Sequence, residues 1–234
     1  MALFTYGKDY VEYRNGGETL RVMAWGENSL RVVSVPNGPL DMSSSALLPQ
    51  EPVEAEITIG EDTAEITNGK ITALFDTRGW NDTAVLTFYN EKKEVILKEI
   101  DRGGALVRRA RFFNPYAGGD YRLKVTFESN PEEKIYGMGQ YQQEVFNLKG
   151  CNLELAHRNS QASVPFYVSS LGYGFLWHNP AIGSVSFGTN TTEWRADSTT
   201  KMDYWITVGD TPAKIEEQYS NAAGKVPMMP EYGL

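Results

Sequence analysis

The stretch that decides the fold covers residues 133–174 and reads EKIYGMGQYQQEVFNLKGCNLELAHRNSQASVPFYVSSLGYG. It opens with the β-prone residues 134–136, and the glycine-rich residues 137–140 predict a turn after them. A polar and aromatic loop follows, and then an amide-rich turn at residues 157–161. The apolar run at residues 164–169 predicts a buried strand. Strands joined by polar loops in this way indicate an all-β protein.

Amide and guanidinium side chains gather in the loop and the turn of this stretch. Gln140, Gln143 and Asn147 belong to the loop, and Arg158 and Asn159 belong to the turn. Amides are neutral, directional donors and acceptors for hydroxyl groups, and aromatic rings cover the apolar face of a pyranose. The pattern is typical of a sugar site, although polar loops also occur on β-proteins for other reasons.

The composition is that of an ordinary globular chain with an acidic balance. The 234 residues carry a formal net charge of −8, and 41% of them are hydrophobic. No basic stripe is available to neutralise phosphates, which argues against a nucleic-acid partner. No apolar run approaches the length of a membrane span, so we expect no membrane partner. The N-terminus, MALFTYGKDY, lacks the features of a signal peptide, and we expect a cytoplasmic location.

The residues that could support metal, thiol or nucleotide chemistry form no known pattern. His157, His178 and Cys151 do not have the spacing of zinc ligands, so we expect no metal, and we expect both histidines to make hydrogen bonds in loops or at strand ends. The single cysteine predicts a free, buried thiol. Residues 137–139 lack the rest of a phosphate-binding motif, and we expect no cofactor.

Two further groups of residues have structural interpretations. Trp177, Trp194 and Trp205 are expected to be core rings rather than platforms for a sugar. The basic cluster of Arg108, Arg109 and Arg111 lies in a β-like run and is expected to place charge on a strand edge.

Short strands separated by turn signals run through most of the chain. The strongest single signal is Asn68-Gly69 between two alternating segments, which predicts a tight hairpin. The regular spacing favours a sandwich over βαβ units. Strands are predicted at residues 9–14, 19–25, 30–35, 53–59, 63–67, 70–76, 84–90, 94–99, 106–113, 121–128, 164–169, 174–177, 183–188, 190–196 and 202–208.

After residue 209 the spacing of the apolar residues changes from that of a strand to that of a helix. Thr211 followed by Pro212 predicts a helix cap with proline in the first turn, and Gly224 predicts the end of the helix. This is the one helix-length segment in the chain. The apolar residues expected on its buried face are Ala213, Ile215, Tyr219 and Ala222.

Several short motifs follow one another between residues 136 and 234. They are Tyr136-Gly137-Met138-Gly139-Gln140, Lys149-Gly150, Arg158-Asn159, Pro165-Phe166-Tyr167-Val168-Ser169, Gly172-Tyr173-Gly174, Asp203-Tyr204-Trp205, Asp210-Thr211-Pro212 and residues 227–233. In order and spacing, this segment resembles the N-terminal β-sandwich of glycoside hydrolase family 31, the α-glucosidase and α-xylosidase family. The first 130 residues resemble the family only in their pattern of short strands.

The resemblance implies a fold and a domain organisation. The expected fold is a large antiparallel β-sandwich of the galactose-mutarotase type with one short C-terminal helix. Residues 1–225 would form the N-terminal domain, and residues 226–234 would begin the connection to a catalytic (β/α)8 barrel that this sequence does not include. The chain would then be the front part of a longer enzyme, with its own barrel as partner.

The resemblance also implies a division of chemical roles. A retaining glycosidase uses two carboxyl groups, which in the family are aspartates of the barrel, so we expect no catalytic residue here. A loop of the front domain helps to line the site for a terminal α-linked glucose or xylose. Asn159 stands where the family's Asn-Arg-Asp segment has its Asp, so the charge of that contact is absent. Arg158, Gln140, Gln143 and Asn147 complete the expected substrate-binding set.

Two other functions stay open. The chain could be a free-standing carbohydrate-binding module, or an aldose epimerase that uses histidines and a glutamate for proton transfer. Without the barrel, an apolar patch should be exposed near residues 211–223 and 226–234, and we expect self-association into homo-oligomers.

Overall fold

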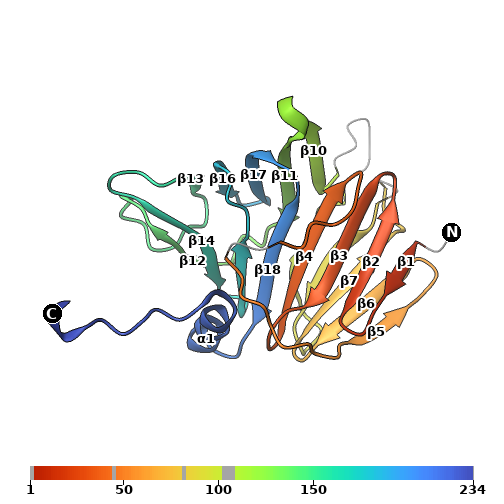
Figure 1. Ribbon diagram of the computed structural model, residues 1–234, viewed down its shortest axis with the longest axis horizontal. Helices are drawn as coiled ribbons and strands as arrows, with labels where there is room; N and C mark the ends of the chain where they lie inside the picture. Colours follow the sequence, from red (N-terminus) through yellow and green to blue (C-terminus); the bar gives the residue numbers. More distant parts are fainter. Residues whose placement is uncertain (1–2, 44–45, 81–82, 102–108, 234) are drawn as a thin grey trace.

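The computed structural model describes residues 3–43, 46–80, 83–101 and 109–233. Within them the chain forms three antiparallel sheets and one α-helix (Figure 1). The all-β prediction is therefore confirmed. The strands are β1 (Phe4–Tyr6), β2 (Tyr10–Asn15), β3 (Glu18–Ala24), β4 (Ser29–Pro36), β5 (Glu56–Ile59), β6 (Thr63–Asn68), β7 (Ile71–Asp76), β8 (Val85–Tyr89), β9 (Val95–Lys98), β10 (Arg111–Pro115), β11 (Tyr121–Glu128), β12 (Ile135–Gln140), β13 (Asn152–Leu155), β14 (Ala162–Ser169), β15 (Tyr173–Trp177), β16 (Gly183–Phe187), β17 (Thr191–Thr199) and β18 (Met202–Val208).

The largest sheet joins the two ends of the chain. Its order is β1-β2-β3-β4-β18-β15-β14-β12, so β18 pairs with β4 and also with β15. The second sheet has the order β10-β11-β17-β16-β13, and the third has the order β5-β6-β7-β8-β9. The predicted Asn68-Gly69 hairpin joins β6 and β7.

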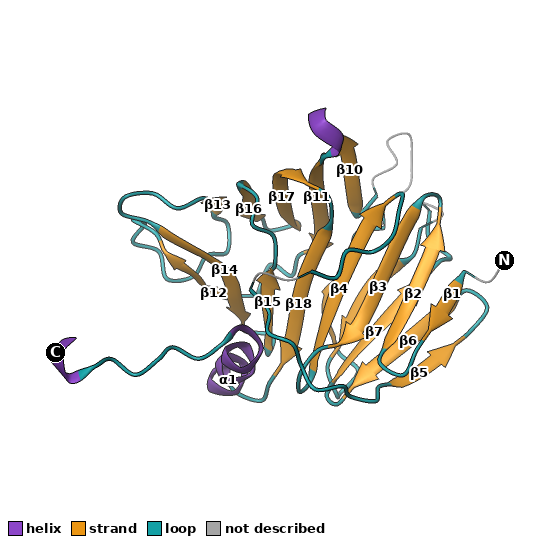
Figure 2. Ribbon diagram, viewed as in Figure 1, coloured by secondary structure: helices purple, strands orange, loops and turns teal. Residues whose placement is uncertain are grey.

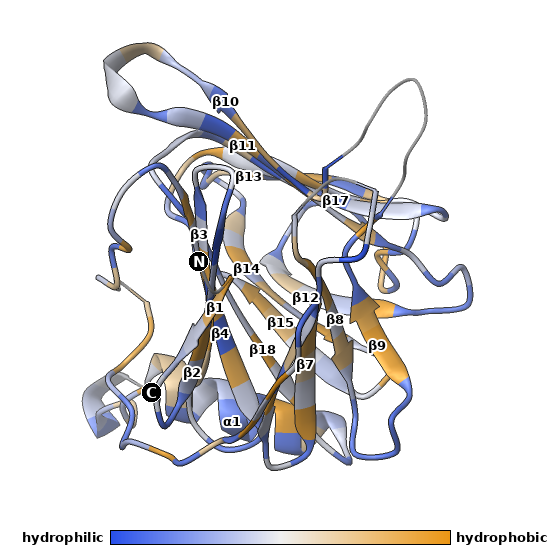
Figure 3. Ribbon diagram, turned by 90° about the vertical axis from the view of Figure 1, so that its right-hand side faces the viewer, coloured by the Kyte–Doolittle hydropathy of each residue, from blue (hydrophilic) through white to orange (hydrophobic). Residues whose placement is uncertain are grey.

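The core lies where the eight-stranded sheet faces the two smaller sheets. Aromatic rings bridge the layers: Tyr204 of the large sheet lies 5.8 Å from Phe127 and 6.2 Å from Phe88, measured between ring centroids. Trp194 and Trp177 stack at 5.4 Å, and both are fully buried. The prediction that three tryptophans are core rings is confirmed: Trp177 and Trp194 are buried in this core, and Trp205 is buried in a second cluster. Figure 3 shows the hydrophobic segments concentrated on the strands.

A second, smaller cluster covers the other face of the large sheet. Ile215 and Ala222 of the helix pack against Phe166, Leu176 and Trp205. Because both faces of the sheet are covered here, every residue of β15 and β18 is buried. This explains why these strands are mostly apolar on both faces instead of alternating between apolar and polar residues.

The helix α1 (Pro212–Ala223) begins and ends as predicted. The side chain of Thr211 accepts a hydrogen bond from the amide of Lys214, Pro212 occupies the first turn, and Gly224 is the C-cap. The predicted buried face was wrong at one position, because Ala213 is exposed. Gln218 is buried instead, where its side chain accepts a hydrogen bond from Thr207.

Three further local predictions were wrong. Residues 137–140 are not a turn between strands but part of β12, where a bulge opposite β14 accommodates Gly137 and Gly139 at positive φ. Strand β13 was not predicted. Cys151 is free, as expected, but half-buried instead of buried.

The basic cluster also differs from its prediction at Arg111, whose side chain is buried rather than on an exposed edge. Its guanidinium donates to Glu18 of β3 at 2.6 Å, to Glu99 after β9, and to the carbonyl of Ala84 at 2.6 Å. One arginine of β10 therefore connects all three sheets. Arg109 is exposed, and Arg108, like the start of the strand predicted at 106–113, lies outside the described residues.

After Gly224 the chain leaves the body of the domain. Residues 225–233, which we call the tail, run away from α1 and end in a single 3-10 turn, η2 (Glu231–Gly233) (Figure 2). Val226, Met228 and Tyr232 are each more than 90% exposed. No helix in the described part of the chain is long and apolar enough to cross a membrane.

Candidate functional site

The predicted substrate-binding residues lie on the part of the domain built by β12, β13 and β14 (Figure 1). Gln140 ends β12, Gln143 and Asn147 lie in the loop that follows, and Arg158 and Asn159 lie between β13 and β14. Four of the five side chains are exposed, and Asn147 is half-buried. The loop and the turn therefore present polar groups at one end of the molecule.

The turn at residues 157–161, which we call the rim turn, is a tight reversal. The backbone amide of Arg158 donates to the carbonyl of Gln161 at 3.0 Å, and the amide of Gln161 donates back at 3.2 Å. These two bonds leave Asn159 and Ser160 at the tip, where both are exposed. The amide of Asn159 is thus presented to solvent on a defined backbone.

Neighbouring residues brace this turn. Gln142 Nε2 donates to Ser160 Oγ at 2.6 Å and so joins the preceding loop to the tip. The Tyr141 hydroxyl donates to the Glu154 carbonyl at 2.9 Å and lies 2.9 Å from Ser163 Oγ. Burial raises the pKa of the Tyr141 hydroxyl above its ordinary value.

The guanidinium of Arg158 is paired within the domain. Its Nε and Nη2 both donate to Glu154 Oε2, at 2.8 and 2.5 Å. The hydrogen bonds and the negative charge of Glu154 raise the pKa of Arg158. The pair is exposed, so its direct contribution to folding is small, but it restricts where the guanidinium can point.

Asn147 has a different role from the other candidates. Its Oδ1 accepts hydrogen bonds from the backbone amides of Ile135 at 3.0 Å and Lys149 at 3.2 Å. The structure therefore brings Arg158 and Asn159 together on the rim turn, while Asn147 fastens the base of the loop to β12.

Sequence reasoning did not find the bracing residues Tyr141, Gln142 and Glu154. A signal existed for Glu154, because it precedes Arg158 by four residues and carries the opposite charge. The other two depend on how β13 and β14 bring the loop and the turn together, which spacing along the chain does not reveal.

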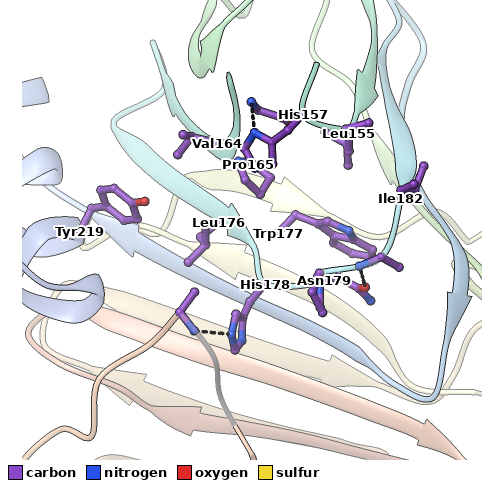
Figure 4. Close-up of a pocket in the computed structure, with 15 residues that line it drawn as sticks. Leu155, His157, Val164, Pro165, Leu176, Trp177, His178, Asn179, Ile182 and Tyr219 are labelled. Atoms are coloured by element: carbon purple, nitrogen blue, oxygen red, sulfur yellow. Dashed lines mark hydrogen bonds between the residues drawn. The ribbon is translucent and has the colours of Figure 1, made fainter. Parts of the chain in front are cut away.

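A cavity of about 500 Å³ lies beside the base of the rim turn (Figure 4). We call it the apolar hollow; its walls come from β13, β14, β15, the segment after β15, and α1. It is lined by Ala46, Leu155, Ala156, His157, Ser163, Val164, Pro165, Leu176, Trp177, His178, Asn179, Pro180, Ala181, Ile182 and Tyr219.

Both histidines line the hollow, and both make the structural hydrogen bonds expected of them. His157 Nδ1 accepts from the amide of Ser163 at 3.3 Å. His178 Nε2 accepts from the amide of Ala46 at 3.2 Å, while its Nδ1 lies 3.1 Å from Asp203 Oδ2. Among the described residues, no three His, Cys, Asp or Glu side chains are grouped so that they could hold a metal ion.

Comparison with known proteins identifies the family. Residues 19–185 match the glycosyl hydrolase 31 N-terminal galactose mutarotase-like domain. The chain belongs to this family. A family 31 glucosidase of Pseudescherichia vulneris, ORF2, described as uncharacterized, is 44% identical over 239 residues, covering 95% of this chain and 44% of its own length. Alpha-xylosidase A of Aspergillus niger is 27% identical over 96% of this chain and 33% of its own.

Solved structures of family 31 agree. A GH31 alpha-xylosidase from a soil metagenome, complexed with xylose, superimposes with a TM-score of 0.91 at 44% identity. The match covers 98% of this chain and 36% of that one. This family 31 domain therefore spans less than half the length of the relatives it matches.

The family motifs of the sequence have structural roles in this domain. Tyr173 of the Gly-Tyr-Gly motif donates to buried Glu133 at 2.7 Å, and Lys149 lies 3.3 Å from the same carboxylate. Asp203 pairs with Arg31 inside the large sheet. Arg158 and Asn159, by contrast, are exposed on the rim turn and are therefore accessible to a ligand.

Proposed function

We propose that this chain is the non-catalytic N-terminal domain of a retaining α-glycosidase of carbohydrate metabolism, an α-glucosidase or α-xylosidase, and that its rim turn lines part of the site for a terminal α-linked glucose or xylose. The observation that supports this most directly is the exposed Asn159 at the tip of a braced turn. A neutral amide at a fixed position can donate to one sugar hydroxyl and accept from another.

The catalytic carboxylates would come from the remaining length that the relatives possess. Retention requires two carboxyl groups about 5–5.5 Å apart on either side of the glycosidic bond. The buried carboxylates that the structure describes serve other groups instead. Asp203 pairs with Arg31, Glu99 pairs with Arg111, Glu12 pairs with Arg21, and Glu133 accepts from Ser169 and Tyr173. The histidines, already bonded within the domain, make an epimerase the weaker alternative.

The first test uses the chain as it is. We expect 4-nitrophenyl α-xyloside and α-glucoside to be hydrolysed no faster than in buffer, and the mutarotation of α-glucose to run at the buffer rate. Hydrolysis by these 234 residues alone would contradict the proposal. Accelerated mutarotation would favour the epimerase instead.

The second test asks whether Asn159 contacts the sugar. The chain is joined to the following portion of the 44%-identical relative, and kinetics are measured on aryl α-glycosides. Asn159→Ala should raise KM about fivefold, the equivalent of one neutral hydrogen bond of about 1 kcal/mol. Asn190→Ala, an exposed amide in the turn between β16 and β17, is the matched control and should leave KM unchanged. Equal KM values for both variants would remove Asn159 from the site.

A further inference from the structure

We infer that the domain has a second sugar site, away from the rim turn, which holds a unit of a neutral oligosaccharide of glucose or xylose. The site is a cavity of about 410 Å³ between the turn that joins β2 to β3, the end of β4, and β10. We call it the polar hollow. Its volume is within the range of about 300–1,000 Å³ that small-molecule sites have. The choice of sugar rests on the proposed function, but the site itself does not require glycosidase activity.

The order of the strands separates the polar hollow from the rim turn. β10 and β13 are the two outer strands of the second sheet. In the largest sheet, β2 and β3 lie toward one edge, while β14 and β12 lie at the other. Figure 1 shows the same separation in space. A sugar in the polar hollow would therefore be bound independently of the site that the rim turn lines.

An open aromatic ring forms one wall of the polar hollow. Phe112 of β10 lines it and is 50% exposed, whereas Arg111 before it is buried. Two more open rings lie on neighbouring connections. Trp80, which is 75% exposed, belongs to the connection between β7 and β8 that lines the hollow through Thr83, and Tyr116 directly follows β10. Open rings beside polar groups suit the apolar face of a pyranose.

Polar side chains with unused hydrogen-bonding capacity line the same cavity. They are Asn37, Thr83 and Arg109, and none of these three side chains makes a hydrogen bond within the described part of the chain. Together they offer an amide, a hydroxyl and a guanidinium group, which can donate to sugar hydroxyls and accept from them. The two histidines of the apolar hollow, by contrast, already accept from backbone amides. The polar hollow is therefore the better suited of the two cavities to a hydroxyl-rich ligand.

The floor of the polar hollow contains a carboxylate that is held in place but not saturated. Glu18 Oε1 accepts from Ser34 Oγ and from Arg111 Nε, both at 2.6 Å. Its Oε2 accepts from Arg111 Nη2 at 3.2 Å, and the side chain keeps 14% of its surface exposed. A carboxylate oxygen can accept more than one hydrogen bond, so Oε2 is available to a sugar hydroxyl.

The charges around the polar hollow favour an uncharged ligand. Arg111 is shared between Glu18 and Glu99, and Arg109 adds a second guanidinium to the lining. Because two glutamates accompany the two arginines, the hollow has no surplus of positive charge to hold an acidic sugar. Neutral hydroxyls, which can bond to both kinds of group, fit it better.

The backbone positions Asn37 before any ligand arrives. The amide of Asn37 donates to the carbonyl of Gly17 at 2.5 Å, and the residue has a φ of 53°. A Cβ atom on Gly17 would lie 2.6 Å from Asn37 Oδ1, so the glycine leaves the room that the side-chain amide occupies. A group that is already in position loses less conformational freedom on binding.

Amide nuclear magnetic resonance spectra of the 234-residue chain, titrated with maltopentaose and xylopentaose, test the inference. At least one of these sugars should shift the signals of residues 15–18 and 109–113 in a saturable way, with a Kd of about 1 mM or below. Pentagalacturonic acid, an acidic counterpart, should bind more weakly. The inference would be overturned by the absence of saturable shifts at these residues with both neutral sugars up to about 10 mM. Tighter binding of the acidic sugar would overturn it as well.

Two variants remove single groups from the polar hollow. Phe112→Ala removes the ring and should weaken binding at least about fivefold. Asn37→Gly removes the side-chain amide but tolerates the positive φ, and it should weaken binding about fivefold, the equivalent of one neutral hydrogen bond. Tyr232→Ala, which removes a 92% exposed ring of the tail, is the matched control and should bind as the parent does. Parent-like affinity in either hollow variant, or an equal loss in the control, would contradict the assignment.

Asn159→Ala separates this inference from the proposed function. If the sugar shifts only residues 157–161, and these shifts disappear in Asn159→Ala, the sugar lies on the rim turn and the second site is overturned. If the parent chain binds sugar in the polar hollow while Asn159→Ala leaves KM unchanged in the joined enzyme, the second site stands and only the rim contact is lost.

Discussion

Asp203 is the residue on which the interior of the large sheet depends most. It accepts from Arg31 Nε at 3.0 Å and Nη2 at 2.6 Å, and all these atoms are buried. His178 and Lys201 lie at 3.1 and 3.7 Å from the same carboxylate. Arg31 also donates to the carbonyl of Ser43, so one carboxylate organises the contact between β4, β18 and the segment that crosses them.

Asp203→Asn should lower the free energy of unfolding by about 3–5 kcal/mol, because it leaves the Arg31 guanidinium buried without its counter-charge. Urea denaturation followed by tryptophan fluorescence measures the change. Asp210→Asn is the control: Asp210 pairs with Lys70 at 2.6 Å but is exposed, and its loss should cost no more than about 1 kcal/mol. Similar losses in both variants would show that the buried Asp203 pair contributes no more to stability than an exposed pair.

The position of helix α1 depends on a glycine in the strand beneath it. A Cβ atom on Gly174 of β15 would lie 2.6 Å from Ile215 Cγ2 and 3.0 Å from the ring of Phe166. The helix can therefore approach the sheet closely enough for Tyr219 to stack on Phe166 at 3.9 Å. This contact explains the second glycine of the Gly-Tyr-Gly motif.

Gly174→Ala should destabilise the domain by about 1–3 kcal/mol through overpacking beneath the helix. Ile215→Ala alone leaves a cavity and should cost about 2–5 kcal/mol. In the double variant the new methyl group occupies part of that cavity, so the combined loss should be smaller than the sum of the two. Thermal unfolding of the three variants gives the coupling, and strictly additive losses would argue against the contact.

At the scale of the whole molecule, the three sheets meet at Arg111. Burial would raise the pKa of Glu18, but the charge and hydrogen bonds of Arg111 outweigh it and hold that pKa below its ordinary value. Burial raises the pKa of Glu99, and Arg111 offsets this only in part. The two glutamates that pair with Arg111 therefore change the stability of the domain in opposite directions as the pH changes.

The signs follow from linkage between proton binding and folding. Glu99, with its raised pKa, contributes stability at low pH that is lost as the pH rises through its folded value. Glu18, with its lowered pKa, contributes stability above its unfolded value that is lost on acidification. Relative to the parent, Glu99→Gln should gain stability as the pH rises from acid to neutral, and Glu18→Gln should lose it. Urea midpoints at several pH values measure both differences, and slopes of the same sign would contradict the assignment.

Much of this architecture was predictable because its signals are local. The Asn68-Gly69 hairpin, the Thr211 cap and the Gly224 stop each depend on residues within one turn, and all three are confirmed. The placement of Arg158 and Asn159 on a turn was predictable for the same reason.

What could not be predicted depends on residues that are distant in sequence. Arg111 looked like an edge charge because its partner Glu18 lies on another sheet, 93 positions away. The bulge in β12 depends on the register with β14, and the burial of Gln218 depends on Thr207 beneath the helix. The hydrogen bonds that brace the rim turn could not be predicted for the same reason, since Gln142 and Ser160 meet only after β12 and β14 have paired.

The pairing of β4 with β18 has a consequence for how the chain is made. Ser34 bonds opposite Met202, so the inner edge of β4 has no partner until almost the whole domain has left the ribosome. At 5–20 residues per second, that wait lasts on the order of ten seconds or more, during which an apolar strand edge is open to other nascent chains. Synthesis speed and chaperone supply, rather than final stability, should therefore limit the yield of this domain in cells.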